Sequence, residues 1–272
     1  MNPFIALALL AGLAASVSSG ITGSFIVVKR IVFISGSIAH SVLGGMGLFL
    51  WIRRTFDLPF ITPLQGAVLA AIASALLMSW VRFKYKQRED TIIATLWSTG
   101  MALGVIFVSL TPGYNVELMN FLFGNILWVN QTDIITLFAL DILVVAVTVI
   151  YFKRFQAVCF DEDQAKLQGI SVNKTYSLLL CMIALAIVLL IQVVGSILVI
   201  AILAIPAAVA SNLTRRLSSM IGLAIIFSML FTILGTFIAY ECNWPPGATI
   251  ALTSALMYIA SIFKQQISSK YF

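Results

Sequence analysis

Residues 1–20 read MNPFIALALLAGLAASVSSG, and this stretch begins an apolar run that continues to Val28. No basic residue precedes the run, and it is longer than the apolar part of a cleaved signal sequence, so we expect the first membrane helix here. About 20 apolar residues are enough to carry a helix across roughly 30 Å of hydrocarbon. Runs of this kind recur along the whole chain, which predicts an all-α, polytopic membrane protein.

The apolar runs predict eight to nine membrane spans within a single transmembrane domain covering residues 1–272. Their expected positions are about 4–28, 31–52, 61–81, 91–110, 132–152, 175–193, 196–212, 218–239 and 247–264. The span at 196–212 is short, and dropping it would change the count. Segment 117–129, ELMNFLFGNILWV, is too short to cross a membrane and too apolar for an ordinary loop. We expect it to lie at the interface or to re-enter the membrane.

Composition supports this class and argues against others. Hydrophobic residues make up 61% of the chain and charged residues 10%, and the mean hydropathy is +1.08. The net charge of +6 sits in short clusters between apolar runs, so nucleic acid is not an expected partner. The three scattered cysteines form no CxxC pair, so neither a structural zinc site nor a disulfide framework is expected.

Basic residues also predict the orientation. With nine spans and the amino terminus outside, the cytoplasmic side receives Lys29, Arg30, Arg82, Lys84, Lys86, Arg88, Lys153, Arg154, Lys166, Lys174, Arg215, Arg216, Lys264 and Lys270. Only Arg53 and Arg54 then fall outside. Positive charge is concentrated on the cytoplasmic side of membrane proteins, so this orientation is favoured over its opposite.

The chain contains no GxxxxGK[ST] phosphate loop and no soluble domain. We therefore do not expect it to be an enzyme. Its energy must come from an ion gradient or from a second protein.

The longest polar stretch, residues 151–174, reads YFKRFQAVCFDEDQAKLQGISVNK. Acidic residues at 161–163 and glycine at 169 predict a short helix with acids in its first turn and glycine at its end. Phe155, Val158 and Phe160 give it an apolar side. Two interpretations stay open: a solvated connector, or a helix that docks into a groove on a cytoplasmic protein.

The one histidine of the chain, His40, lies within a predicted span. Residues three and four positions away share its helical face, and these are Gly36, Ser37, Leu43 and Gly44. Small residues let helices approach closely, so a histidine bonded across a tight interface is one interpretation. The other is a metal ligand, because ionisable groups are expensive in a membrane and neutral imidazole binds zinc well. Near a two-fold axis His40 would occur twice.

Three further residues, two inside predicted spans and one between two spans, stand out. Gly195 and Pro206 bracket a short apolar run, which indicates either a packing kink or a gating hinge. Asp141 lies inside span 132–152, where a carboxylate must snorkel, pair with another helix or line a path. Ser37 and Asp141 are possible helpers of His40 in binding a metal.

Several motifs together resemble one family. FDEDQAKLQGI (160–170) is similar to the FDxxxAxxxGI coupling segment of bacterial ABC-importer permeases for zinc, manganese and iron. The likeness extends, in the family's order, to four other stretches: GSFIVVKRIVFISGSIAHSVLGGMGL (23–48), LFGNILWV (122–129), VVGSILVIAILAIPAAVA (193–210) and PPGATI (245–250).

The resemblance implies a multi-pass permease of the bacterial cytoplasmic membrane. Such a permease pairs with a second permease chain, identical or not, docks on a cytoplasmic ATP-binding subunit and receives metal from an extracytoplasmic metal-binding protein. The coupling helix would cover about residues 155–170, with Phe160, Asp161, Ala165 and Gly169 matching the pattern. No permanently bound cofactor is implied, only the transported zinc, manganese or iron.

The resemblance also identifies a departure. The family pattern around the histidine reads GDxxxH, and Gly36 stands here in place of the aspartate. Three sources of a replacement donor are open: Ser37, Asp141, or a second, non-identical permease that keeps the aspartate. Two alternative functions also stay open. One is a permease for a metal chelate such as a siderophore, and the other is a secondary transporter with Asp141 and His40 as a proton relay.

Overall fold

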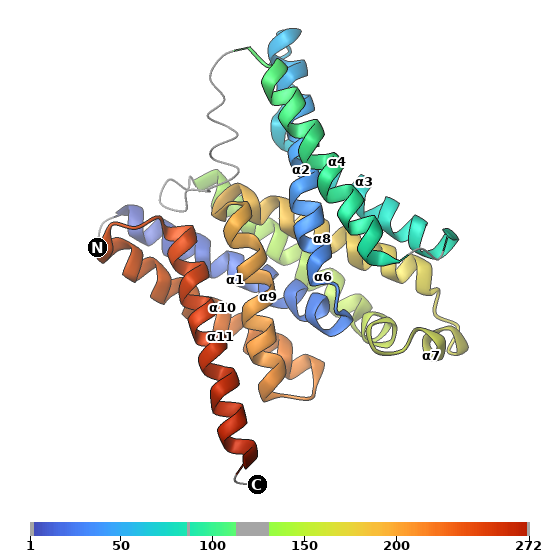
Figure 1. Cartoon of the computed structure of the whole chain (residues 1–272), viewed down its shortest axis with the longest axis vertical. Helices are drawn as coiled ribbons and strands as arrows, with labels where there is room; N and C mark the ends of the chain where they lie inside the picture. Colours follow the sequence, from blue (N-terminus) through green and yellow to red (C-terminus); the bar gives the residue numbers. More distant parts are fainter. Residues whose placement is uncertain (1–2, 86–87, 113–130, 271–272) are drawn as a thin grey trace. The chain divides into compact units, whose positions relative to one another are not determined.

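The computed structural model describes residues 3–85, 88–112 and 131–270, and this part of the chain contains ten helices and no strand. The helices are α1 (Pro3–Lys29), α2 (Val32–Thr55), α3 (Pro63–Tyr85), α4 (Glu89–Leu110), α6 (Gln131–Phe160), α7 (Glu162–Leu167), α8 (Val172–Val194), α9 (Ser196–Leu213), α10 (Leu217–Cys242) and α11 (Pro246–Lys270). Figure 1 shows their order along the chain. The predicted all-α membrane fold is confirmed.

Eight of the described helices are long and apolar enough to cross a membrane. The short predicted span at 196–212 corresponds to α9, whose apolar part, Leu198–Leu213, is shorter than these eight. The predicted central segment 117–129 lies outside the described residues.

The helix before the coupling segment is longer than the apolar pattern indicates. The predicted span ends at 152, but α6 continues to Phe160. Phe155 and Val158 are fully buried, so two further turns pack as part of α6. The short helix that follows is α7, with six residues, whereas the sequence pattern placed a helix over about 155–170.

Two compact units make up the chain, and the prediction of a single domain over 1–272 stays a prediction. The first unit comprises Met1–Arg30, Leu122–Phe152 and Leu189–Phe272. In it, α1 packs against α9 and α10, and α9, α10 and α11 pack on one another. A cluster of small and apolar side chains lies at its core: Ala207, Ala210, Met220 and Ala224.

The second unit comprises Ile31–Phe121 and Lys153–Val188. In it, α2 packs against α4 and α3, as Figure 1 shows. Glycines make these contacts close: a Cβ at Gly44 would lie 2.9 Å from the carbonyl oxygen of Gly100, and one at Gly47 would lie 3.0 Å from that of Gly104. Small residues at helix contacts are how membrane helices gain van der Waals packing where lipid is as apolar as the side chains.

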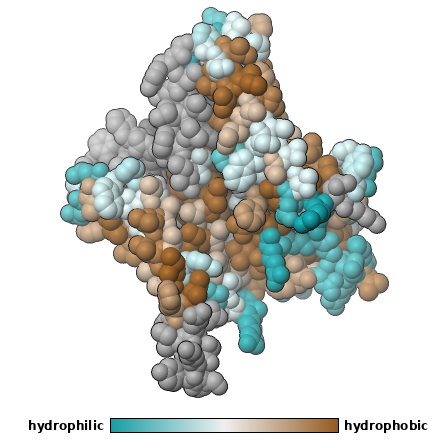
Figure 2. Space-filling view, in the orientation of Figure 1, coloured by the Kyte–Doolittle hydropathy of each residue, from teal (hydrophilic) through white to brown (hydrophobic). Residues whose placement is uncertain are grey.

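Large apolar side chains remain on the surface. Val149 and Ile150 of α6 are 72% and 73% exposed, and Phe237 of α10 is 65% exposed. Figure 2 shows such apolar residues over much of the visible face, interrupted by hydrophilic patches. In a membrane protein these side chains face lipid, because hydrocarbon there takes the place of a protein core.

Candidate functional site

His40 lies in the middle of α2, and its imidazole is only partly covered, whereas the preceding residues 34–39 are buried. Its ring stacks on Trp97 of α4, with centroids 4.6 Å apart and planes 22° from parallel. The close α2–α4 contact at Gly44 and Gly100 lies one turn further along α2. The packing of these two helices therefore fixes where the imidazole sits.

Within the described residues, no hydrogen bond or ion pair engages either ring nitrogen of His40. The same part of the chain contains no group of three or more histidine, cysteine, aspartate or glutamate side chains that would hold a metal ion. Among the described residues, His40 is therefore not part of a complete metal site, and its role as a metal ligand stays a prediction.

Ser37, the proposed helper one turn before His40, is fully buried. Its hydroxyl donates a hydrogen bond to the carbonyl oxygen of Ile93 in α4 at 3.0 Å. This bond uses the proton of the hydroxyl and leaves oxygen lone pairs, so a role as a weak metal donor stays a prediction. Its observed contact ties the beginning of α2 to the beginning of α4.

Asp141, the other proposed helper, belongs to the first compact unit. It is 7% exposed, and one carboxylate oxygen accepts hydrogen bonds from the amide of Ser18, at 3.1 Å, and from the Ser18 hydroxyl. The next residue of α1, Ser19, bonds to Ser228 of α10 through their hydroxyls at 3.1 Å. Of the three possibilities for this carboxylate, pairing with another helix is the one observed.

The coupling segment has a defined beginning and end. Asp161 caps α7, because its carboxylate accepts hydrogen bonds from the backbone amides of Asp163 and Gln164, both at 3.0 Å. Gly169 ends the turn at φ +76°, which a residue without Cβ adopts freely. Ile170 then donates to the carbonyl of Ala165 at 3.0 Å, the six-to-one bond of a Schellman motif. These bonds make the segment an ordered element rather than a flexible linker.

The four motif positions have separate structural roles. Asp161 caps the beginning of α7, and Gly169 ends the turn that follows the helix. Ala165 lies within α7 on its buried side. Phe160 is 61% exposed, and Leu167, outside the motif, is 88% exposed. A hollow of about 320 Å³ adjoins Phe160 and is lined by Lys153, Gln156, Ala157, Phe160, Asp161, Gln164, Ala165 and Gln168. A docking role for this surface stays a prediction.

Charges on the outer side of α7 pair locally. Lys166 donates to Asp163 at 2.8 Å, and both side chains are exposed. This hydrogen bond, together with the opposite charge of Lys166, lowers the pKa of Asp163, and the same contact raises the pKa of Lys166. Because the pair is solvated, it contributes little to stability and leaves both charges available to a partner.

The proposed hinge residues lie at the beginning of α9 and inside it, in the first unit. Gly195 lies between α8 and α9 with φ +84° and ψ +160°, a region open essentially to glycine alone. Its amide still bonds to the Ile191 carbonyl at 2.8 Å, so the chain redirects within a single residue. Pro206 is buried inside α9. A gating role for the two residues stays a prediction.

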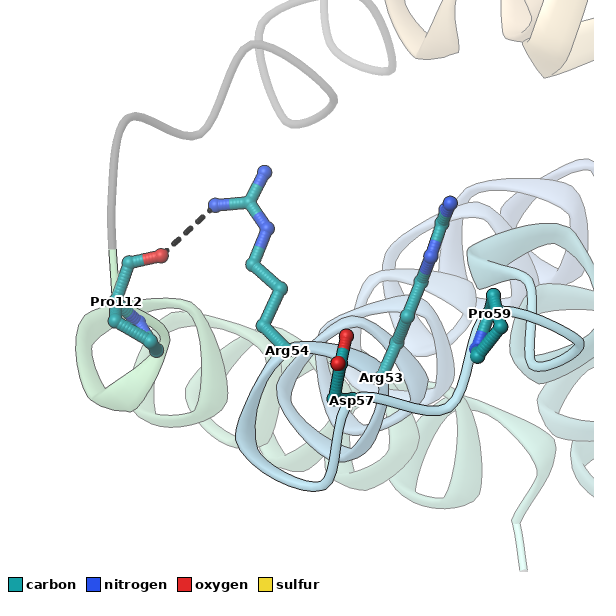
Figure 3. A pocket seen from close by; sticks show the side chains of 5 residues that line it. All are labelled: Arg53, Arg54, Asp57, Pro59 and Pro112. Atoms are coloured by element: carbon teal, nitrogen blue, oxygen red, sulfur yellow. Dashed lines mark hydrogen bonds between the residues drawn. The ribbon is translucent and has the colours of Figure 1, made fainter.

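The two arginines predicted outside, Arg53 and Arg54, end α2 beside a hollow of about 570 Å³. Figure 3 shows both guanidinium groups extending from the helix end, with Asp57 and Pro59 on the loop that follows. Arg54 donates to the carbonyl of Pro112 at 3.0 Å. The hollow is a small, polar, basic recess at one end of the α2–α4 bundle.

Comparisons with known proteins identify the chain's relationships. Residues 1–265 match the model of the ABC 3 transport family. The chain belongs to that family. A "probable metal transport system membrane protein" of Chlamydia pneumoniae is 46% identical over 93% of this chain and 86% of its own length.

Two other relatives within the family carry the names of specific metals. A manganese transport system membrane protein of Listeria innocua is 33% identical over 96% of this chain and 90% of its own. A high-affinity zinc uptake system membrane protein of Haemophilus influenzae is 30% identical over 95% of this chain and 97% of its own. Among solved structures, PsaBC from Streptococcus pneumoniae in complex with Fab matches with a TM-score of 0.84 and 30% identity, covering 99% of this chain and 95% of that one.

Membership of the ABC 3 family confirms the resemblance seen in the sequence motifs. The chain is a multi-pass protein of the bacterial cytoplasmic membrane. The sequence patterns did not identify Ser18, Trp97 or Arg82 as partners of the singled-out residues. The only signal for them was residue type: a serine-rich first span, an aromatic on another span, and a basic residue in a cluster predicted to be cytoplasmic.

Proposed function

We propose that this chain is the permease subunit of an ATP-driven importer for a divalent metal ion, with zinc or manganese as the cargo. The match of residues 1–265 to the family and the names of the relatives support this. Iron, the third metal of the sequence prediction, has no support from these relatives. The metal is a substrate in transit, so no permanently bound ion is part of the proposal.

The observation that best supports a metal path is the environment of the His40 side chain. An imidazole in a membrane helix is costly unless its nitrogens are used. Here the ring is partly exposed and stacked, and no described residue bonds to it. A neutral imidazole with free nitrogens is a good ligand for zinc and a usable one for manganese. A single ligand from each chain also suits transport, because a site in transit must release its ion.

Two permease chains would bring two histidines to one path. With glycine at position 36, two identical copies would supply imidazoles without the adjacent carboxylates, a set that favours zinc over the more oxygen-preferring manganese. A second, non-identical permease that keeps the aspartate would add a carboxylate. We favour the second arrangement, because two different permeases would then share one pathway. Purification of the native complex with only one permease species would overturn it.

The coupling helix would face a separate cytoplasmic ATPase. Phe160 and Leu167 supply exposed apolar surface, while Asp161 and Gly169 hold α7 in a fixed shape. ATP binding would close the ATPase dimer and push α7, and the helices would alternate between outward and inward access, with Gly195 and Pro206 as hinge points. On the opposite side, Arg53 and Arg54 would face the extracytoplasmic protein that delivers the metal.

The experiment is ATP-dependent uptake of radioactive zinc and manganese by the complete transporter in proteoliposomes. His40→Ala removes the ligand and the ring, whereas His40→Phe removes the nitrogens but keeps an aromatic ring against Trp97. If His40 is a ligand, both variants lose uptake while the complex still assembles. Normal uptake by His40→Phe would show instead that His40 serves packing.

An inactive ATPase partner provides the second arm. It should abolish uptake even when a proton gradient is imposed. Uptake that persists under the gradient would overturn the ATP-driven function in favour of a proton-coupled transporter. Uptake of a ferric siderophore, but not of free zinc or manganese, would overturn the cargo assignment.

A further inference from the structure

Arg82, in the last turn of α3, extends to the coupling helix. Its Nη2 donates to Oε1 of Glu162, the first residue of α7, at 2.7 Å. The two side chains are only 20% and 22% exposed, whereas those of the Asp163–Lys166 pair on the outer side are 91% and 58% exposed. A charge-assisted bond that is partly shielded from water is stronger and better fixed in geometry than a solvated pair. The inner pair therefore holds α7 to α3.

The same guanidinium also contacts α8. It lies 4.2 Å from the ring centroid of Tyr176, which is 1% exposed, and Tyr176 meets Phe83 edge to face at 5.6 Å. About one turn back along α3, the hydroxyls of Ser79 and Ser177 are 2.6 Å apart. Arginine is suited to this double role because its planar group pairs with a carboxylate and stacks on an aromatic face at once. Both ends of the α7 connection are thus joined to α3.

On its other side, Arg82 borders the beginnings of the helices that carry the candidate site. A narrow hollow is lined by Ile34 of α2, Met78 and Arg82 of α3, Ile92 and Ile93 of α4, and Tyr176 of α8. The carbonyl oxygen of Ile93 accepts a hydrogen bond from the hydroxyl of Ser37, and Ser37 lies one turn before His40 in α2. Trp97, which stacks on His40, is one turn after Ile93. All these residues belong to the second compact unit.

We propose that Arg82 is a positioning residue of transport: its bond to Glu162 and its stack on Tyr176 join the coupling helix to the α2–α4 bundle that carries His40. This inference rests on the proposed function. A push on α7 then moves α3 and, through the side chains that line the shared hollow, the first turns of α2 and α4. Without Arg82, α7 still docks on the ATPase and the ATPase still hydrolyses ATP. The displacement of α7 is then absorbed at α7 itself and does not reach the α2–α4 bundle.

The test measures two rates in the same proteoliposomes: metal ions transported and ATP molecules hydrolysed by the complete complex. Arg82→Gln and Glu162→Gln should each lower the ratio of metal to ATP at least tenfold, with ATPase activity within twofold of the unmodified complex. Arg82→Lys should be impaired as well, because an ammonium group cannot stack and pair as a planar fork does. The swapped pair Arg82→Glu with Glu162→Arg should recover part of the loss.

Lys84→Gln is the matched control. It removes the same charge two residues further along α3, from a side chain that is exposed and lies 5.1 Å over Trp80. Its ratio should equal that of the unmodified complex. A normal ratio in Glu162→Gln would overturn the inference, and this variant carries the test even if Arg82→Gln fails to assemble. Absence of ATP-driven uptake in the unmodified complex would instead contradict the proposed function.

Discussion

Substitution of Gly100 by alanine should separate α2 from α4 beside His40. A Cβ at this position would come closest to the backbone Cα of Ser41, and it would also lie 2.8 Å from the Cβ and 3.0 Å from the backbone nitrogen of that residue. Carbon atoms in contact prefer about 3.5–4.0 Å, so the helices must move apart by at least about 0.7 Å. Overpacking of this kind costs about 1–3 kcal/mol, because the obstacle includes backbone that cannot rotate away.

Gly222→Ala in α10 serves as the control, because a Cβ there has nothing within 4 Å. Both variants gain about 0.5–1 kcal/mol from replacing a helical glycine, and this gain cancels in the comparison. The remaining difference is the crowding cost, about 1–3 kcal/mol, which at about 2–4 °C per kcal/mol lowers the melting temperature of Gly100→Ala by about 2–12 °C relative to Gly222→Ala.

The assay is thermal unfolding of both purified variants in one detergent, followed by tryptophan fluorescence. Zinc and manganese uptake measured in parallel should fall in Gly100→Ala alone, since the displaced α4 carries Trp97 away from the imidazole. Equal melting temperatures for the two variants would refute the close α2–α4 contact at Ser41.

Three other substitutions test local features. Asp161→Ala should lose both capping bonds of α7, worth about 0.5–2 kcal/mol, and weaken ATPase association in a pull-down, while Asp161→Asn keeps most of it. Gly169→Ala meets no neighbouring atom, so its expected cost of about 1–2 kcal/mol is backbone strain alone, seen as faster proteolysis of the 161–170 segment. Ser18→Ala should destabilise the first unit by about 1–3 kcal/mol in thermal unfolding by removing a donor to Asp141, and adding Asp141→Asn should lessen that loss.

Helix positions were largely predictable, because membrane thickness and flanking basic residues set where an apolar run begins and ends. The exception is informative. Lys153 and Arg154 look like the start of a loop, yet α6 continues to Phe160. The continuation depends on burial of Phe155 and Val158 against other segments, and the stop depends on the cap at Asp161. Hydropathy describes contact with lipid and contains neither piece of information.

The candidate site was predictable by residue type but not by partner. His40, Asp141 and the 160–170 motif stand out because polar groups are rare in apolar runs. Their contacts come from distant parts of the chain: Asp141 is 123 residues from Ser18, and Glu162 is 80 residues from Arg82. A serine in a serine-rich helix and an arginine in a basic cluster carry no individual signal, so only the packing of the helices identifies them.

The stack of His40 on Trp97 is itself an argument about function. Packing of α2 against its neighbours is supplied by glycines, at Gly44, Gly45 and Gly47, and does not need an aromatic ring at position 40. If the ring served only to cover Trp97, phenylalanine would give the same stack without two nitrogens to satisfy in an apolar medium. Histidine at this position carries a desolvation cost that the described contacts do not offset. A passing metal ion, bound at an unengaged nitrogen, is the interaction that would offset it.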